Sequence, residues 1–215
     1  MNISVILSGG VGARFCPKTP KQYHQVNGKQ IISYVVEALH KCQDSHKTVI
    51  VAAEEDCKRL KEDYGLDVAC SGATHNHSVK NALDYIKARY PECKKVLFAD
   101  SCRPFITPCQ AKELYDLLDG YDAVFTAKHI TDSLGNEDEI FVERSPYFLI
   151  QKPEGFVFDT LFENFEAGSR ATAIVQQMPK GAKIKKYYTA DLNLKITYPQ
   201  DLQLAEALIK IQGVV

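Results

Sequence analysis

A short apolar run that leads directly into a glycine-rich loop constrains this chain most. Residues 3–7 (Ile-Ser-Val-Ile-Leu) have the composition of a buried strand, and residues 8–14 (Ser-Gly-Gly-Val-Gly-Ala-Arg) follow without a break. A loop in that position emerges at the carboxyl edge of a sheet, where open α/β folds bind their ligands. Glycines let backbone N–H groups approach phosphate oxygens closely. The pattern therefore predicts an α/β sheet with a phosphate site at the end of its first strand.

Two cations near this loop indicate which phosphate it binds. Arg14 ends the loop, and Lys21 follows in a Pro-Lys-Gln triplet, so both can neutralise a polyphosphate and a leaving pyrophosphate. The loop lacks the third glycine of the dinucleotide fingerprint, and no Gly-Lys-Ser/Thr follows it as a Walker loop requires. The sequence therefore predicts a nucleoside triphosphate as the ligand. The loop residues expected to contact it are Leu7, Ser8, Gly9, Gly10 and Gly12.

Composition and charge exclude several classes of protein. The 215 residues are 45% hydrophobic, which is enough for a full core in one domain. A formal net charge of -1 provides no basic field for a nucleic-acid backbone, and the first apolar run is too short for a signal peptide or a membrane span. Seven scattered cysteines without a Cys-x-x-Cys pair predict reduced thiols. We expect a cytoplasmic protein that binds neither nucleic acid nor membranes.

Extended and helical patterns alternate along the chain. The predicted strands after the first are residues 47–52, 66–70, 95–99 and 121–127. The predicted helices between them are residues 31–41, 54–64, 78–89 and 109–118. The later elements are expected to be a helix near 156–165, strands at 182–188 and 193–197, and a helix at 199–211. This order predicts a single-domain, Rossmann-like α/β fold over residues 1–215, with a mostly parallel twisted sheet and helices on both faces.

Residues 131–153 interrupt the alternation. A Gly-Asn-Glu-Asp turn at 135–138 separates two short extended pieces, which predicts a projecting β-hairpin arm. Aromatic and aliphatic side chains such as Phe141 and Tyr147 cannot be buried within so small an arm. We therefore expect a second copy of the chain to cover them; the alternative is that the arm folds back on its own sheet.

Further polar residues follow the other predicted strands. Asp100 comes directly after one of them, so its carboxylate could hold Mg²⁺ against triphosphate oxygens. Gly72 and Ser78 flank a loop suited to a base or a ribose. Asn193 and Lys195 share a face of a late strand, because alternate strand residues point the same way. Ordinary structural roles remain open, since Asp100 could cap a helix and Lys195 could be a solvated strand lysine.

The order of short motifs resembles a known family. Gly-Gly-x-Gly-x-Arg, Pro-Lys-Gln, Asp-x-x-Arg-Pro, Asp-Ser, Val-x-Arg and Asn-x-Lys-x-Thr-x-Pro-x-Asp-Leu occur in that order over nearly the whole chain. They look like the motifs of the family of methylerythritol phosphate and ribitol phosphate cytidylyltransferases, which have a nucleotidyltransferase A-type fold. The resemblance implies a homodimer with interlocked arms and a dependence on Mg²⁺. It also implies an enzyme that converts CTP and a polyol phosphate to a CDP-polyol and pyrophosphate.

The resemblance implies a role for each matching residue. Arg14, Lys21 and Lys195 would be catalytic, holding the triphosphate and stabilising the α-phosphate during in-line attack by the acceptor phosphate. Asp100 would bind Mg²⁺, with Asn193 as a second metal ligand. The acceptor would be bound by Arg103, Ser133, Arg144 and Lys152, with Ser133 and Arg144 reaching across from the partner's arm.

Departures from the family pattern concern the acceptor. The family's Thr-Pro-Gln after the arm is Lys152-Pro153-Glu154 here, and its later Thr-Asp-Asp/Glu segment has no counterpart in residues 170–174. We therefore expect an acceptor other than methylerythritol phosphate, with an amino group facing Glu154 or an anionic group facing Lys152. A ribitol-like phosphate, another polysaccharide precursor and a phosphonate are the candidates. The alternative is methylerythritol phosphate itself, the acceptor in isoprenoid synthesis.

Two other classes of protein remain as alternatives. A dinucleotide-dependent oxidoreductase would use the glycine loop and Glu54, although its fingerprint leads directly into a helix and the connection from residue 9 to residue 29 is longer. A regulatory module would bind the nucleotide without turnover. Because Gly72 is followed by Ala-Thr-His instead of the family's acidic residue and arginine, UTP also remains open as the nucleotide.

Overall fold

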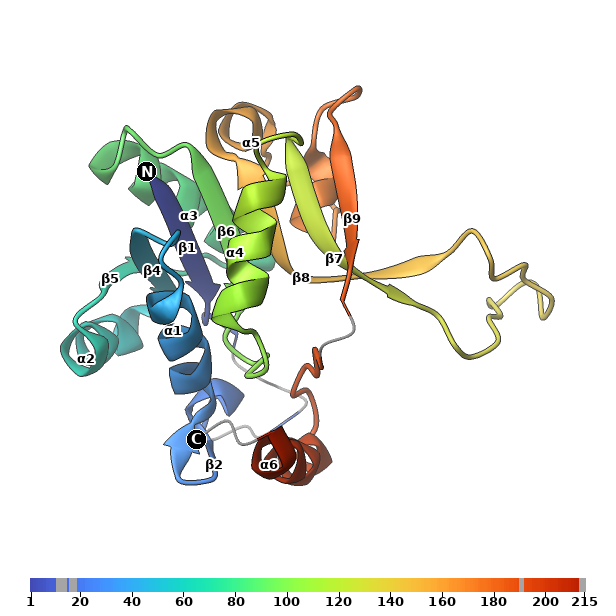
Figure 1. The fold of residues 1–215 in the computed structure, drawn as a ribbon, viewed down its shortest axis with the longest axis horizontal. Coiled ribbons are helices and arrows are strands. Elements are labelled where there is room, and N and C mark those ends of the chain that lie inside the picture. Colours follow the sequence, from blue (N-terminus) through green and yellow to red (C-terminus); the bar gives the residue numbers. More distant parts are fainter. Residues whose placement is uncertain (11–14, 16–18, 190–191, 213–215) are drawn as a thin grey trace.

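A seven-stranded sheet forms the centre of the computed structural model, which describes residues 1–10, 15, 19–189 and 192–212 (Figure 1). The strand order is β5-β4-β1-β6-β8-β7-β9. Strand β8 runs antiparallel to β6 and β7, and the remaining neighbours pair in parallel. The strands are β1 (Asn2–Leu7), β4 (Lys47–Ala52), β5 (Asp67–Cys70), β6 (Lys95–Asp100), β7 (Ala123–His129), β8 (Phe148–Val157) and β9 (Ile184–Tyr188). The predicted mostly parallel sheet is confirmed.

Helices cover both faces of this sheet, as predicted. One face packs against α3 (His75–Arg89) and α5 (Phe158–Asn164). The other packs against α1 (Ile31–Lys41), α2 (Glu54–Tyr64) and α4 (Pro108–Leu117). The central strands contribute alternate side chains to the two hydrophobic layers, because successive strand residues point to opposite faces.

A third, smaller core lies below the carboxyl edge of the sheet. The C-terminal helix α6 (Gln200–Gln212) packs there beside a short hairpin of β2 (Gln25–Val26) and β3 (Lys29–Gln30). Ile196 and Phe105 are buried in the same cluster. This core fixes the segment that carries Lys195 against the main sheet. Two 3₁₀ turns complete the elements, η1 (Lys21–Tyr23) and η2 (Ile174–Gln177).

One element prediction is wrong, and one predicted helix begins later than expected. Residues 193–197 form no strand. The backbone N–H of Ile196 donates to the Cys102 carbonyl at 3.0 Å, but this bond is not continued into a strand pairing. The side chains of this segment pack into the third core instead of joining the sheet. Residues 156–157 belong to β8, and helix α5 begins only at Phe158. Phe156 pairs with β6 and β7 on either side, so its apolar side chain marks a central strand.

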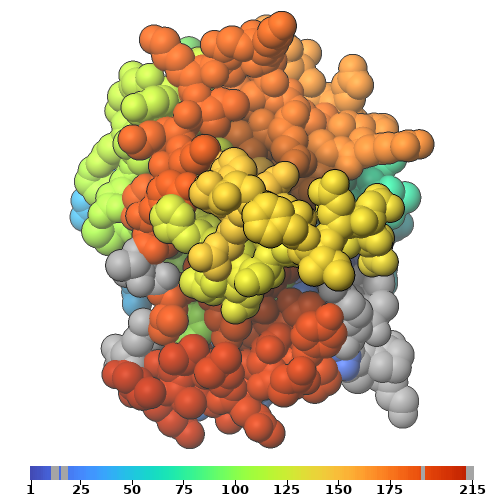
Figure 2. Space-filling model, turned by 90° about the vertical axis from the view of Figure 1, so that its right-hand side faces the viewer, coloured from blue at the N-terminus to red at the C-terminus, as the bar shows by residue number. Residues whose placement is uncertain are grey.

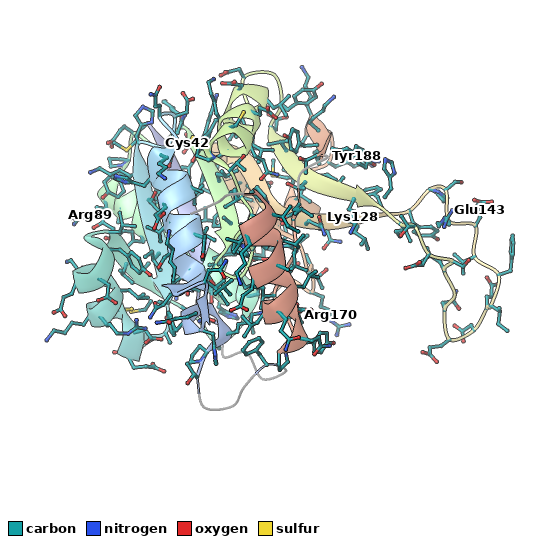
Figure 3. All side chains as sticks on the ribbon, turned by 60° about the horizontal axis from the view of Figure 1, so that its bottom comes forward. Cys42, Arg89, Lys128, Glu143, Arg170 and Tyr188 are labelled. Carbon is teal, nitrogen blue, oxygen red and sulfur yellow. The ribbon has the colours of Figure 1, made fainter. Side chains whose placement is uncertain are left out.

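The predicted arm projects from the end of β7 and returns into β8 (Figure 1). Within it, Leu134 and Val142 form an isolated antiparallel bridge. Figure 2 looks along the arm, which stands above the C-terminal helix. Figure 3 shows Lys128 at its base and Glu143 on its outer part. Ile140 is 96% exposed and Phe141 is 83% exposed, whereas Phe148 and Ile150 at the return of the arm pack against the main core, so only the outer part of the arm leaves its apolar residues unburied.

Among the described helices, none combines the length and the hydropathy that crossing a bilayer requires.

Candidate active site

A cavity of about 480 Å³ lies at the carboxyl ends of β1, β5 and β6. It is the sheet edge at which the glycine loop was expected to emerge. The structure brings most of the predicted nucleotide and catalytic residues together around it. Those that line the cavity are Leu7, Gly9, Gly10, Lys21, Gly72, Ser78, Asp100 and Lys195. Gly12 and Arg14 lie outside the described residues.

The loop after β1 is held by close packing and by one buried glutamine. A Cβ on Gly9 would lie 2.3 Å from the Cβ of Ser71, so only glycine lets this loop touch the loop after β5. Gln22 donates its side-chain amide to the carbonyls of Ser8 at 2.7 Å and Gly10 at 3.3 Å. Gln22 therefore holds its neighbour Lys21 beside the loop. The sequence pattern does not predict this role.

The loop after β5 is organised by Ser78. Its hydroxyl accepts a hydrogen bond from the Gly72 backbone N–H at 3.0 Å and donates to the Thr74 carbonyl at 3.0 Å. A Cβ on Gly72 would lie 2.4 Å from the Cβ of His77, so the loop and the first turn of α3 are in tight contact. Ser78 thus holds the backbone groups of this loop at the cavity wall.

A cluster of one carboxylate and two cations closes the β6 side of the cavity. Arg103 Nε donates to Asp100 Oδ2 at 3.0 Å, and Lys195 Nζ lies 3.2 Å from the same oxygen. Burial alone would raise the pKa of Asp100, but the charges of Lys195, Arg103 and Lys152 outweigh it and hold the pKa well below its usual range. Asp100 is therefore ionised at neutral pH, and Lys195 keeps a side chain that is 44% exposed toward incoming ligands.

Arg103 and Asn193 connect this cluster to β8. Arg103 Nη1 donates to the Asn193 carbonyl at 2.8 Å. The Asn193 side-chain amide donates to Gln151 Oε1 at 3.1 Å and to the Lys152 carbonyl at 2.8 Å. These bonds fix the segment that carries Lys195, and neither Arg103 nor Asn193 is among the residues lining the cavity.

Lys152 and Glu154 lie inside the protein rather than facing an acceptor. Lys152 is 6% exposed and Glu154 1%. Lys152 Nζ donates to Glu154 Oε1 at 2.6 Å, and the Val175 backbone N–H donates to Oε2 at 2.7 Å. The expectation that Glu154 faces an amino group of the acceptor is wrong, because both of its carboxylate oxygens already have partners within the fold.

The remaining predicted acceptor residues lie on the arm. Arg144 donates from Nη1 to the carbonyls of Thr131 and Asp132, the latter at 3.1 Å. Ser133 is exposed nearby. Neither residue is among those that line the cavity.

His75 is a cavity residue to which the sequence analysis gave no role. It lies exposed at the start of α3 and lines the cavity with Ser101 and Cys102. Desolvation of the ring, followed by the charge of Lys152, lowers the pKa of His75. The ring is therefore neutral at neutral pH. Neither His75 nor the nearby His77 carries a sequence signal that separates it from a solvated side chain.

No ready-made metal cage surrounds Asp100. Among the described residues, no group of three or more histidine, cysteine, aspartate or glutamate side chains could hold a metal ion. Arg103 and Lys195 both contact Oδ2 of Asp100. A divalent cation here would need oxygens from the substrate as well as from the protein, which is the usual manner of magnesium at phosphates.

A glycine loop, lysines and an ionised carboxylate at the carboxyl edge of a mostly parallel sheet define a nucleotidyltransferase. Residues 2–211 match the family model described as "IspD: 2-C-methyl-D-erythritol 4-phosphate cytidylyltransferase". The chain belongs to the IspD family, whose members are cytidylyltransferases. The resemblance inferred from the motifs is confirmed, and the dinucleotide-dependent oxidoreductase is not supported.

Individual relatives and solved structures agree with this assignment. The chain is 28% identical to the 2-C-methyl-D-erythritol 4-phosphate cytidylyltransferase of Thermosipho melanesiensis, over 99% of each chain. It is 30% identical to the protein of that name from Bacteroides thetaiotaomicron, over 95% of this chain and 98% of the relative. The structure of the Thermus thermophilus cytidylyltransferase has the same fold, with a TM-score of 0.80 at 24% identity over 98% of this chain and 100% of that one.

Proposed function

We propose that this protein transfers CMP from CTP to 2-C-methyl-D-erythritol 4-phosphate and releases pyrophosphate. The observation that carries the proposal is the cavity itself, where Lys21, Lys195 and Asp100 surround the glycine loop in a chain that matches the family over residues 2–211. The relatives that cover nearly the whole chain bear the name of this activity.

The burial of Lys152 and Glu154 bears on the acceptor. These two charges replace a hydroxyl and an amide of the family pattern, and they would favour a different acceptor only if they faced it. Because these charges neutralise each other inside the fold, they present no net charge with which to select an amine or an additional anion. The names of the relatives then favour methylerythritol phosphate over a ribitol-like phosphate or a phosphonate.

The proposed mechanism needs positioning and charge more than a general base. An oxygen of the acceptor phosphate attacks the α-phosphorus of CTP in line, and the bond from that phosphorus to the bridging oxygen of pyrophosphate breaks. Lys195 and Lys21 stabilise negative charge on the phosphoryl oxygens and on the leaving group, and Arg14 is proposed to join them. Asp100 and Arg103 hold the Lys195 ammonium at the cavity wall.

We propose Mg²⁺ as the divalent cofactor of this site. Asp100 suits it because the carboxylate is ionised. The Asn193 side-chain oxygen is the second ligand expected from the sequence, but Asn193 is not among the residues lining the cavity, so the remaining oxygens would come from the substrate. When bound, the cation would neutralise phosphate charge and orient the triphosphate. Lys195 and Arg103 keep Asp100 deprotonated for that purpose at neutral pH.

We also propose a homodimer formed through the arm. Ile140 and Phe141 are almost fully exposed and need a partner surface. A second copy would bring Ser133 and Arg144 toward the cavity of its partner, where they would bind the acceptor phosphate. Because its substrate CTP is a cytoplasmic metabolite, we place the enzyme in the cytoplasm.

An acceptor panel tests the proposal. Pyrophosphate release would be measured with Mg²⁺ and either CTP or UTP, across methylerythritol phosphate, ribitol phosphate, glycerol phosphate and aminoethylphosphonate. We expect release with CTP and methylerythritol phosphate above all other combinations. A better rate with another acceptor would overturn the acceptor assignment, and CTP binding without release from any of them would favour a regulatory module.

A further inference from the structure

Two cysteines outside the proposed chemistry lie in contact beside the cavity. The sulfur atoms of Cys57, in the first turns of α2, and Cys70, the last residue of β5, are 3.6 Å apart. The two elements are adjacent because β5 pairs with β4, whose last residue Ala52 lies opposite Cys70. Helix α2 begins at Glu54, so its first turns return to the end of β5.

The two thiols differ in access to solvent. Cys70 is exposed, whereas Cys57 is half-buried with its Sγ 3.3 Å from the Ala53 carbonyl. Burial, followed by Cys70 and the nearby Asp56 and Glu54, raises the pKa of Cys57 to about 12. Cys70 is therefore the thiol that meets a reagent from solution first, and Cys57 is the one that reacts second, once the two are side by side.

Residues close to each cysteine in the sequence line the cavity. Ala53 precedes α2 and lines the cavity, and so does Ser71, which follows Cys70. The Ser71 backbone N–H donates to the Ala52 carbonyl at 2.7 Å. Ser71 is also the residue that packs against Gly9, so a change at Cys70 reaches the glycine loop directly.

We propose that Cys57 and Cys70 form a reversible disulfide that changes the shape of the nucleotide cavity. The reagent it would take is a small disulfide such as oxidised glutathione. The Cys70 thiolate attacks one sulfur of the reagent, forming a mixed disulfide and releasing one glutathione thiolate. The Cys57 thiol then loses its proton and attacks the Cys70 sulfur, which releases the second glutathione thiolate. Two cysteine thiols are oxidised, and one glutathione disulfide is reduced to two thiols.

Closing the bond shortens the distance between the two sulfurs from 3.6 Å to the roughly 2.0 Å of a disulfide. Cys70 is bonded to Ser71, which lies so close to Gly9 that only glycine fits there. We therefore expect closure of the bond to shift Ser71 against the glycine loop. We expect oxidation to raise the Kd for CTP several-fold and reduction to restore it. This consequence rests on the proposed function, whereas formation of the bond does not.

Peptide mapping tests the bond itself. The full chain would be incubated with oxidised glutathione, quenched with acid and N-ethylmaleimide, and digested with trypsin. Cys57 and Cys70 fall in separate tryptic peptides, residues 48–58 and 62–80, so a linked pair of these peptides identifies the disulfide by mass. We expect that pair in the wild type and in Cys109→Ser, which changes another exposed cysteine. In Cys57→Ser a glutathione adduct on Cys70 should persist.

Specific results would overturn the inference. A persistent glutathione adduct on wild-type Cys70, or linkage of Cys70 to other cysteines as readily as to Cys57, would show that the pair does not close. Titration of CTP into the mapped oxidised and reduced proteins tests the second part. An unchanged Kd would show that the bond does not reach the cavity. Absence of CTP binding to the reduced protein would instead count against the proposed function, with the disulfide judged by the mapping alone.

Discussion

Two groups of charged side chains lie at neighbouring strands, and they serve different ends. At the end of β6, Asp100 meets two cations, Arg103 and Lys195, and this cluster opens on the cavity. On β8, Lys152 and Glu154 form a closed pair with no excess charge. The first group leaves one positive charge uncompensated where a phosphate would enter. The second leaves none, so its charges serve the fold.

The difference shows why a charged residue near a site is not evidence of a ligand. A buried ion pair contributes little net stability, yet removal of one partner is costly because the other stays charged without a counter-ion. The closed pair should therefore matter most for folding. The open cluster should matter most for turnover, since its surplus charge is useful only when an anion arrives.

Breaking the closed pair should have the largest effect. Glu154→Gln retains an oxygen that can accept from the Val175 N–H but removes the charge that Lys152 faces. We expect a loss of about 3–5 kcal/mol in the free energy of unfolding, measured by urea denaturation. The double variant Lys152→Met with Glu154→Gln should recover most of it, since no buried charge remains. Equal stability of the single variant and the wild type would contradict the pairing.

Removing a charge from the open cluster should have the next largest effect. This effect should appear in kcat and not in the stability of the fold. Lys195→Met keeps the aliphatic stem and removes the charge at the cavity. We expect kcat to fall by on the order of 10²-fold or more, as for other preorganised electrostatic groups, with a urea midpoint close to the wild type. The matched control Lys185→Met changes an exposed lysine of β9 and should leave kcat unchanged. A comparable loss in the control would show that net charge alone is responsible.

The sequence predicts the open cluster far better than the closed pair. Asp100 and the glycine loop follow strands whose apolar runs are unmistakable, so their meeting at one sheet edge can be inferred. Lys195 lines the cavity, although its segment is a loop and not the predicted strand. It is held there by the third core and by Arg103, which are contacts between distant segments that local periodicity cannot show.

The closed pair could not be placed from sequence because burial depends on the neighbours of β8. Residues two apart on a strand share a face, so contact between Lys152 and Glu154 is compatible with the sequence. Glu154 lies between Phe98 of β6 and Phe125 of β7, and the pairing with β7 shifts register just beyond it. Neither the central position of β8 nor that irregularity has a local signal. The same holds for Gln22, whose partners are backbone carbonyls of another segment.

The free energy of unfolding at acid pH tests the open cluster through Asp100, with a smaller expected effect. The folded-state pKa of Asp100 is below its unfolded value of about 3.9, so the folded protein binds fewer protons at that site. Its contribution to stability is present above about pH 4 and is lost as the pH falls toward the folded pKa. In Asp100→Asn, we expect the slope of unfolding free energy against pH in that acid window to decrease, by at most about 1.4 kcal/mol per pH unit. An identical slope in both proteins would exclude Asp100 as the source.

The smallest effect is expected at His75, whose pKa depends on both groups of charge. Its pKa is lowered first by desolvation and then by Lys152, while Asp100 and Glu154 raise it and Lys195 lowers it. The folded ring therefore binds fewer protons than the unfolded one, and its contribution to stability is lost as the pH falls below about 6.5.

Removing the surplus charge with Lys195→Met should raise the pKa of His75. Removing the closed pair with Lys152→Met and Glu154→Gln deletes two opposing influences, so the shift should be smaller. Proton NMR titration of the imidazole, assigned by its absence in His75→Gln, measures both shifts. A larger shift in the double variant would mean that Lys152 acts on the cavity as an uncompensated charge, and that the two groups differ less than their geometry indicates.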